Sequence, residues 1–172
     1  MGWETSLPAS IDTTVARVGA SLAAADIAVT DRDLTRPWGG FLVISAGDID
    51  KFVGVYFPGA GIDLTGASPG LSPKILLVAP GHRLSWQYHL RRSEIWRVLE
   101  GPVGISRSPS DVEPALCSYA PGELVRLDLG ERHRLAGLAD WGVVAEIWQH
   151  ADGMDRSDEH DIVRVTDDHG RA

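Results

Sequence analysis

From about Phe41 onward, the chain consists of short apolar runs separated by turns that contain Gly or Pro. The runs include FLVIS, KFVGVYF, KILLVA, EIWRVLEG, GELVRLDL and GVVAEIW. They have the length of strands and are rich in β-branched and aromatic residues, which favour strands over helices. Many short strands with turn signals between them are typical of a β-sandwich or a β-barrel. The sequence therefore predicts an all-β fold for most of the chain.

One segment in front of the strand-rich region has the periodicity of a helix, and its alanine content favours one. The recurring apolar residues are Ile11, Val15, Val18 and Leu22. We predict a helix over residues 11–26 that packs on the barrel as an appendage. The chain then divides into an N-terminal helical extension, 1–35, and a barrel domain, 36–172. Residues 58–73 are rich in Gly, Pro and Ser and predict a mobile loop at the barrel mouth.

Charge and composition exclude several classes of partner. The chain has 172 residues and a formal net charge of −8, whereas a nucleic-acid backbone requires a basic surface. Residues 1–10 lack a basic region followed by an apolar core, and no apolar run is long enough to cross a bilayer. We therefore expect a cytoplasmic protein that binds neither nucleic acid nor membrane. The single cysteine, Cys117, excludes an intramolecular disulfide, and we expect it to be buried.

Four polar residues have the spacing of a metal site. Gln87 and His89 are two apart, so on a strand their side chains point to one face. Glu94 follows after a short interruption, and His133 follows another strand and a turn. Two imidazoles, a carboxylate and an amide oxygen form a mixed ligand set that suits Zn, Mn, Fe, Co or Ni.

Each of these residues also has a purely structural explanation. The two histidines could line a barrel with their rings hydrogen-bonded to backbone carbonyls. Glu94 could pair with Arg91 or Arg92, and the neutral amide of Gln87 is a weak metal ligand. Taken one at a time, the residues favour the structural explanation, but their combined spacing favours a metal site.

The combined spacing resembles the two motifs of the cupin superfamily. The first motif, Gly…His-x-His…Glu…Gly, is matched with Gln in place of the first His, at Gly81, Gln87, His89, Glu94 and Gly101. The second is matched at Gly122, Gly130 and His133, while Asp128 and Gly137 stand where Pro and Asn are usual. The resemblance implies a double-stranded β-helix, or jelly-roll barrel, with one divalent metal ion. Zinc is the first expectation for that ion.

Three segments are similar to the cupin domain of type II mannose-6-phosphate isomerases. RLSWQYHLRRSEIWRVLEG resembles the family's LSLQxHHHRSEHWxVxxG, in which Gln also replaces the first cupin His. RPWGGF, which begins at Arg36, is similar to the family's RPWG, and DIVRVTDDHGR (161–171) is similar to its DIVRxEDxYGR ending. Leu90, Arg91 and Ile95 replace family histidines, so the sugar need not be mannose and could be a heptose.

The resemblance implies a stand-alone, metal-dependent aldose–ketose isomerase of a sugar phosphate, such as mannose 6-phosphate. A base would remove the proton α to the carbonyl and return it to the neighbouring carbon. Lys74 and Glu146 are the candidate catalytic residues. Glu146 lies in an apolar run, which indicates either an inward polar site or the exposed face of an amphipathic strand. Lys74 could instead protect the edge of a sheet.

Phosphate binding requires Arg or Lys. The candidates lie in segments that resemble the isomerases, and they are Arg36, Arg92, Arg134 and Arg164. Arg92 is the first choice because it is close to the metal ligands in sequence, although each arginine could form only a salt bridge. Two other functions stay open: a non-catalytic cupin that binds a sugar or metabolite, and a metal-dependent oxygenase. By analogy with other cupins, we expect a homodimer.

Overall fold

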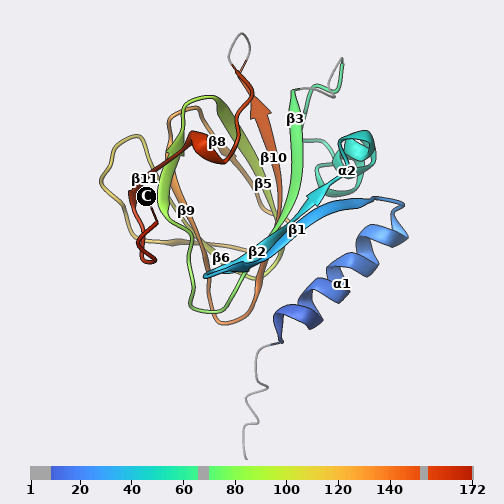
Figure 1. Cartoon of the computed structure of the whole chain (residues 1–172), viewed down its shortest axis with the longest axis horizontal. Helices are drawn as coiled ribbons and strands as arrows, with labels where there is room; N and C mark the ends of the chain where they lie inside the picture. Colours follow the sequence, from blue (N-terminus) through green and yellow to red (C-terminus); the bar gives the residue numbers. More distant parts are fainter. Residues whose placement is uncertain (1–8, 66–69, 152–154, 172) are drawn as a thin grey trace, which may run out of the picture.

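The strands of this protein form two antiparallel sheets that face each other and close into a barrel, with a helix on the outside (Figure 1). The computed structural model describes residues 9–65, 70–151 and 155–171. In chain order, the elements are α1 (Ile11–Ala24), β1 (Val29–Arg36), β2 (Gly39–Ile44), η1 (Ala46–Asp48), α2 (Ile49–Tyr56), β3 (Leu71–Val78), β4 (Trp86–His89), β5 (Arg92–Glu100), β6 (Val103–Ser108), β7 (Cys117–Tyr119), β8 (Leu124–Leu127), β9 (Arg132–Gly137), β10 (Gly142–His150), η2 (Glu159–Asp161) and β11 (Ile162–Thr166).

The chain passes back and forth between the two sheets. The six-stranded sheet has the order β1-β2-β3-β10-β5-β8, and the five-stranded sheet has the order β11-β4-β9-β6-β7. Consecutive strands such as β3 and β4, or β5 and β6, therefore belong to different sheets. This is the arrangement of a jelly roll, and it confirms the predicted all-β barrel with a short N-terminal helix.

Two apolar cores lie on the two faces of the six-stranded sheet. On its outer face, Ile75 and Ile147 pack with residues of α1 and α2, such as Leu22 and Phe52. On its inner face, between the sheets, a second core is formed by residues that include Leu76, Val78, Val98, Ile105, Leu135 and Val144. Each buried large apolar side chain contributes roughly 1.5–3 kcal/mol to stability.

Strand alternation on β3 and β10 fixes which side chains enter the barrel. Ile75 and Ile147 belong to the outer core, whereas Leu76 and Val144 belong to the inner one. Because successive side chains on a strand point to opposite faces, the even-numbered residues of both strands face the interior. Lys74, Glu146 and Trp148 are therefore carried inward.

Helix α1 begins as predicted and ends two residues earlier, at Ala24. The hydroxyl of Ser10 accepts a hydrogen bond from the Thr13 backbone N–H at 3.2 Å and so caps its first turn. The strand predicted for KFVGVYF is wrong, because helix α2 covers these residues up to Tyr56. The buried residues of α2 are Ile49, Phe52 and Val53, which have helical spacing.

Other boundaries also differ from the expected ones. The six-stranded sheet begins at Val29, in front of the expected barrel start at Arg36. Residues 71–73 of the predicted loop belong to β3, and residues 66–69 lie outside the described residues. Cys117 is exposed, so the prediction that it is buried is wrong. None of the described helices is long and apolar enough to span a membrane.

Candidate metal centre and cavity

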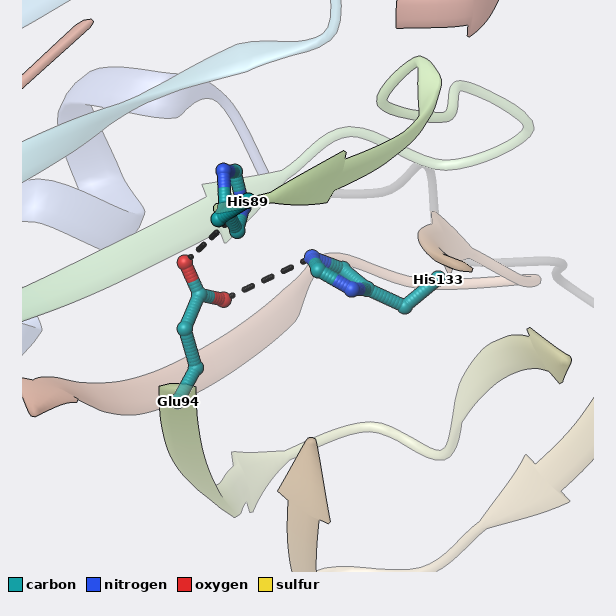
Figure 2. A group of neighbouring side chains, drawn as sticks. All are labelled: His89, Glu94 and His133. Atoms are coloured by element: carbon teal, nitrogen blue, oxygen red, sulfur yellow. Dashed lines mark ion pairs between the residues drawn. The ribbon is translucent and has the colours of Figure 1, made fainter. Parts of the chain in front are cut away.

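Three side chains from three strands converge inside the barrel. His89 lies on β4, Glu94 on β5 and His133 on β9, and each is only 2% exposed. Figure 2 shows the carboxylate of Glu94 between the two imidazole rings. Glu94 Oε1 lies 3.1 Å from His89 Nε2, and Glu94 Oε2 lies 3.6 Å from His133 Nε2. The potential ligand atoms all lie within 4.8 Å of one another, so one ion could contact all three.

Backbone carbonyls set the proton positions on both rings. His89 Nδ1 lies 3.3 Å from the Asp161 carbonyl oxygen, and His133 Nδ1 lies 2.9 Å from the Glu131 carbonyl oxygen. A carbonyl oxygen only accepts, so each Nδ1 carries a hydrogen, and in the neutral ring Nε2 then presents a lone pair. His133 Nε2 is buried without a hydrogen-bond partner among the described residues. Two such lone pairs and a carboxylate fit a divalent metal ion.

The charges of the group also suit a metal ion. Burial lowers the pKa of His133 to about 4, so its ring is neutral at pH 7. Burial raises the pKa of Glu94, but His89 and Arg92 outweigh this effect and hold that pKa well below its usual range. The site therefore presents one ionised carboxylate and a neutral imidazole, as metal coordination requires.

Gln87 lies next to this group, as its spacing predicts. It is the register partner of His133 on the neighbouring strand, and it lines a cavity beside the metal group. Its Oε1 accepts a hydrogen bond from the hydroxyl of Ser85 at 2.5 Å. Its role as a fourth ligand stays a prediction.

Arg92 is buried and holds Glu94 in place. Its Nε donates to Glu94 Oε1 at 2.8 Å, and its Nη2 donates to His89 Nε2 at 3.1 Å. Its Nη1 donates to the Ser157 hydroxyl at 2.8 Å, and its guanidinium stacks 3.6 Å over the ring of Trp148. A metal ion bound to His89 Nε2 would replace the hydrogen bond that Arg92 donates to that atom. With its other donors engaged, Arg92 is better placed to orient Glu94 than to bind a phosphate.

A cavity opens beside the metal group and contains about 540 Å³ of empty space, part of it continuous with solvent. The charged residues that line it are Arg36, Lys74, Arg92, Glu94, Glu146, Glu159, Arg164 and Arg171. The structure thus brings three of the four predicted phosphate ligands together. Arg134 is not among the lining residues. It pairs instead with Glu113 at 3.0 Å and donates to Thr166.

The two candidate catalytic residues meet across β3 and β10, where Lys74 and Glu146 are register partners. The indole N–H of Trp96 lies 3.1 Å from Glu146 Oε1 and 3.1 Å from Glu94 Oε2, so it bridges the two carboxyl groups. Burial, followed by the charge of Glu94, raises the pKa of Glu146 to about 8. Glu146 is therefore an inward residue, and the alternative of an exposed position is wrong.

Lys74 lies deep in the same cavity. Strand β3 has β2 on one side and β10 on the other, so protection of a sheet edge does not explain this lysine. Its Nζ is 3.4 Å from the centre of the Trp148 ring and 3.4 Å from Glu159 Oε1. Burial lowers the pKa of Lys74, and the charges of Glu146 and Glu159 oppose that effect.

Sequence reasoning assigned no role in the site to Trp96, Glu159 or Arg171, which also line the cavity. As a tryptophan on a predicted strand near the metal ligands, Trp96 could belong to the core or to the site, and Arg171 lies within the segment that resembles the isomerase ending. Glu159 gave no signal in the sequence, because its approach to Lys74 depends on contacts distant along the chain.

No family model and no curated protein matches the sequence. Among solved structures, this chain is similar to KdgF from Halomonas sp., with 12% identity, a TM-score of 0.51, and coverage of 71% of this chain and 89% of KdgF. It is also similar to oxalate decarboxylase from Bacillus subtilis, with 12% identity, a TM-score of 0.57, and coverage of 78% of this chain and 30% of the decarboxylase.

Likeness at this level of identity shows the fold and gives no support to one isomerase family. Both structures are cupins. This chain therefore has the cupin fold, with a buried His–Glu–His group inside the barrel that is consistent with one metal ion.

Proposed function

We propose that this protein is a metal-dependent aldose–ketose isomerase of a small sugar phosphate. The observation that carries the proposal is the position of Glu146. Its carboxyl group is buried, lines the cavity, and shares the Trp96 indole N–H with Glu94. A proton-transferring group thus lies one side chain away from the candidate metal ligands.

The residues of the cavity suit the transfer of a proton between neighbouring carbons. One carboxyl group can accept the proton from the first carbon and return it to the second, provided that it stays within hydrogen-bond reach of both. Trp96 restrains Glu146 through its N–H. Lys74, on the partner strand, adds positive charge to the same cavity. A divalent ion held by His89, Glu94 and His133 would supply a Lewis acid for the substrate oxygens.

The remaining cations support a phosphorylated substrate. Arg36 and Arg164 line the cavity from β1 and β11, two strands that belong to different sheets. Guanidinium groups recognise phosphate through charge-assisted hydrogen bonds. Together with Lys74, they make this part of the cavity basic on a protein whose net charge is −8. The proposal therefore assigns phosphate binding to Arg36 and Arg164 and orientation of Glu94 to Arg92.

Deuterium exchange tests the reaction directly. The metal-loaded protein is incubated in D₂O with a panel of hexose, pentose and heptose phosphates, and NMR is used to detect deuterium at C2 of the aldose or C1 of the ketose. Glu146→Gln should reduce exchange by about 10²–10⁴-fold. Glu123→Gln, an exposed carboxylate outside the cavity, is the matched control.

Each other result points to a different function. Binding of sugar phosphates without any exchange or conversion would favour a non-catalytic binding protein. Oxygen consumption by the Fe(II)-loaded protein would favour an oxygenase. Full exchange in the Glu146→Gln variant would exclude Glu146 as the proton carrier.

A further inference from the structure

Apart from Arg92, Glu94 and Glu146, the charged residues that line the cavity are four cations and one carboxylate. The cations are Arg36, Lys74, Arg164 and Arg171, and the carboxylate is Glu159. Arg36 pairs with Asp33 at 2.8 Å, and Arg171 pairs with Asp167 at 2.6 Å. These two arginines thus have acidic partners outside the cavity lining. The counter-ion of Lys74 comes instead from the cavity lining itself, in the form of Glu159.

Lys74 and Glu159 form a long ion pair in which the lysine is buried and the glutamate is partly exposed. The Lys74 side chain is 10% exposed and the Glu159 side chain 48% exposed, and their charged atoms are 3.4 Å apart. That distance is long for a hydrogen bond. An ammonium has three donors, and Glu159 is the only hydrogen-bond acceptor for them in the part of the chain that the structure describes. The other neighbours of Nζ are the rings of Trp148 and Phe41.

The backbone that carries Glu159 is fixed on both sides of it. Asp158 accepts a hydrogen bond from the His160 N–H at 2.9 Å and caps η2. The buried carboxylate of Asp161 accepts from the backbone N–H groups of Leu90 and Arg91, each at 3.0 Å. Rotation of the Glu159 side chain can therefore release Lys74 without moving the segment that carries it.

We propose that the Glu159 carboxylate is an internal competitor at an anion subsite formed by Lys74, and that the phosphate group of a ligand displaces it. The phosphate class of ligand rests on the proposed function. A phosphate offers the ammonium more charge and more acceptor oxygens than one half-exposed carboxylate does. A neutral sugar offers neither and leaves Glu159 in place. Glu159 thus lowers the affinity of the subsite for every phosphorylated ligand. A neutral ligand does not displace Glu159 from Lys74 and therefore gains no contact with the subsite.

Calorimetric titration with inorganic phosphate at constant ionic strength tests this exchange on the metal-loaded protein. Glu159→Gln and Glu159→Ala should both tighten phosphate binding by about two- to fivefold, as expected for the loss of a partly exposed competing ion pair. Asp155→Asn is the matched control, because it removes a negative charge from an exposed residue of the same segment. It should change the dissociation constant by much less.

A double-mutant cycle shows whether the effect acts through Lys74. Lys74→Gln should weaken phosphate binding, and in that background Glu159→Gln should no longer tighten it. Unchanged or weaker binding in both Glu159 variants would overturn the proposal, because Glu159 would then contribute to the ligand site instead of competing for it. Failure of phosphate to bind any variant at millimolar concentration would also overturn it.

The outcome is independent of the reaction. Phosphate binding that tightens without deuterium exchange would leave the anion subsite intact and remove the isomerase assignment. Deuterium exchange in a protein whose phosphate affinity does not respond to the Glu159 variants would keep the isomerase assignment and remove the competitor role of Glu159.

Discussion

Arg92 and Glu94 lie two residues apart on β5 and form an ion pair of 2.8 Å in which both side chains are almost completely buried. Successive odd or even residues of a strand share a face, so this pair is built into the local geometry of the strand. The pair connects the candidate metal group to the segment that carries Ser157 and Asp158, because Arg92 also donates to both of these residues.

Removal of Arg92 should destabilise the protein strongly. Arg92→Ala leaves the carboxylate of Glu94 buried without its guanidinium partner, and breaking a buried pair in this way costs about 3–5 kcal/mol. We expect a loss of that size in the free energy of unfolding of the metal-free protein, measured with urea. Arg17→Ala, which breaks a surface pair with Glu100, is the control and should cost about 1 kcal/mol or less. A loss for Arg92→Ala as small as that of the control would argue against the positioning role.

Substitution of the two histidines of the metal group should lower the metal content of the protein. His89→Ala and His133→Ala should each remove most of the bound divalent ion, because each removes an inward-facing lone pair. His82→Ala, an exposed histidine outside the group, should leave the metal content unchanged. Elemental analysis of the purified variants is the measurement, and circular dichroism checks that the barrel is folded. Full occupancy in both site variants would place the metal elsewhere.

Trp96→Phe keeps the ring and removes the N–H that lies between Glu94 and Glu146. Since small displacements of a reacting group can lower rates by up to about 10²-fold, we expect deuterium exchange to fall by about ten- to a hundredfold while metal content is kept. Trp86→Phe is the matched control, because the indole of Trp86 is buried but donates to the Asp111 carbonyl outside the cavity. Equal losses in the two variants would indicate a general packing effect.

Acid should destabilise the metal-free protein through two histidines. Burial is the main cause that lowers the pKa of His133 and of His150 to about 4, against 6.5 in the unfolded chain. Between pH 6.5 and 4 these two histidines therefore bind more protons in the unfolded state than in the folded state, and their contribution to stability falls as the pH falls. Glu146 contributes with the opposite sign, because its folded-state pKa of about 8 lies above the 4.5 of the unfolded chain. Above pH 6.5 neither histidine contributes to the pH dependence.

Urea unfolding across this pH window measures the effect. Each histidine contributes a slope of up to about 1.4 kcal/mol per pH unit. His150→Gln should reduce the slope, whereas His160→Gln, on a 92% exposed residue, should not. A slope that is the same in the parent protein and in His150→Gln would contradict the assignment.

The barrel and the metal group could be predicted because their signals are local. Strand alternation places Gln87 and His89 on one face, and the turn-bounded runs mark the strands that carry them. The same rule applied to β9 would have excluded Arg134 from the cavity, because it directly follows His133 and points to the opposite face. The error at α2 has a different cause, since its β-branched and aromatic residues favour a strand while its buried positions have helical spacing.

The contacts around Lys74 could not be predicted, because they depend on tertiary structure. Glu159 and Trp148 reach the lysine from segments more than seventy residues further along the chain. Only the register between β3 and β10, and the path of the chain over the cavity, bring these groups together.

The candidate metal ligands come from both sheets, so the site exists only in the folded barrel. Glu94 belongs to the six-stranded sheet, whereas His89 and His133 belong to the five-stranded one. The three ligands are adjacent only after the two sheets have closed on each other, so the unfolded chain offers no comparable chelator. An ion that binds the folded chain alone raises the unfolding free energy with its concentration. A metal ion held by all three ligands would therefore be selected by the folded barrel and not by the unfolded chain.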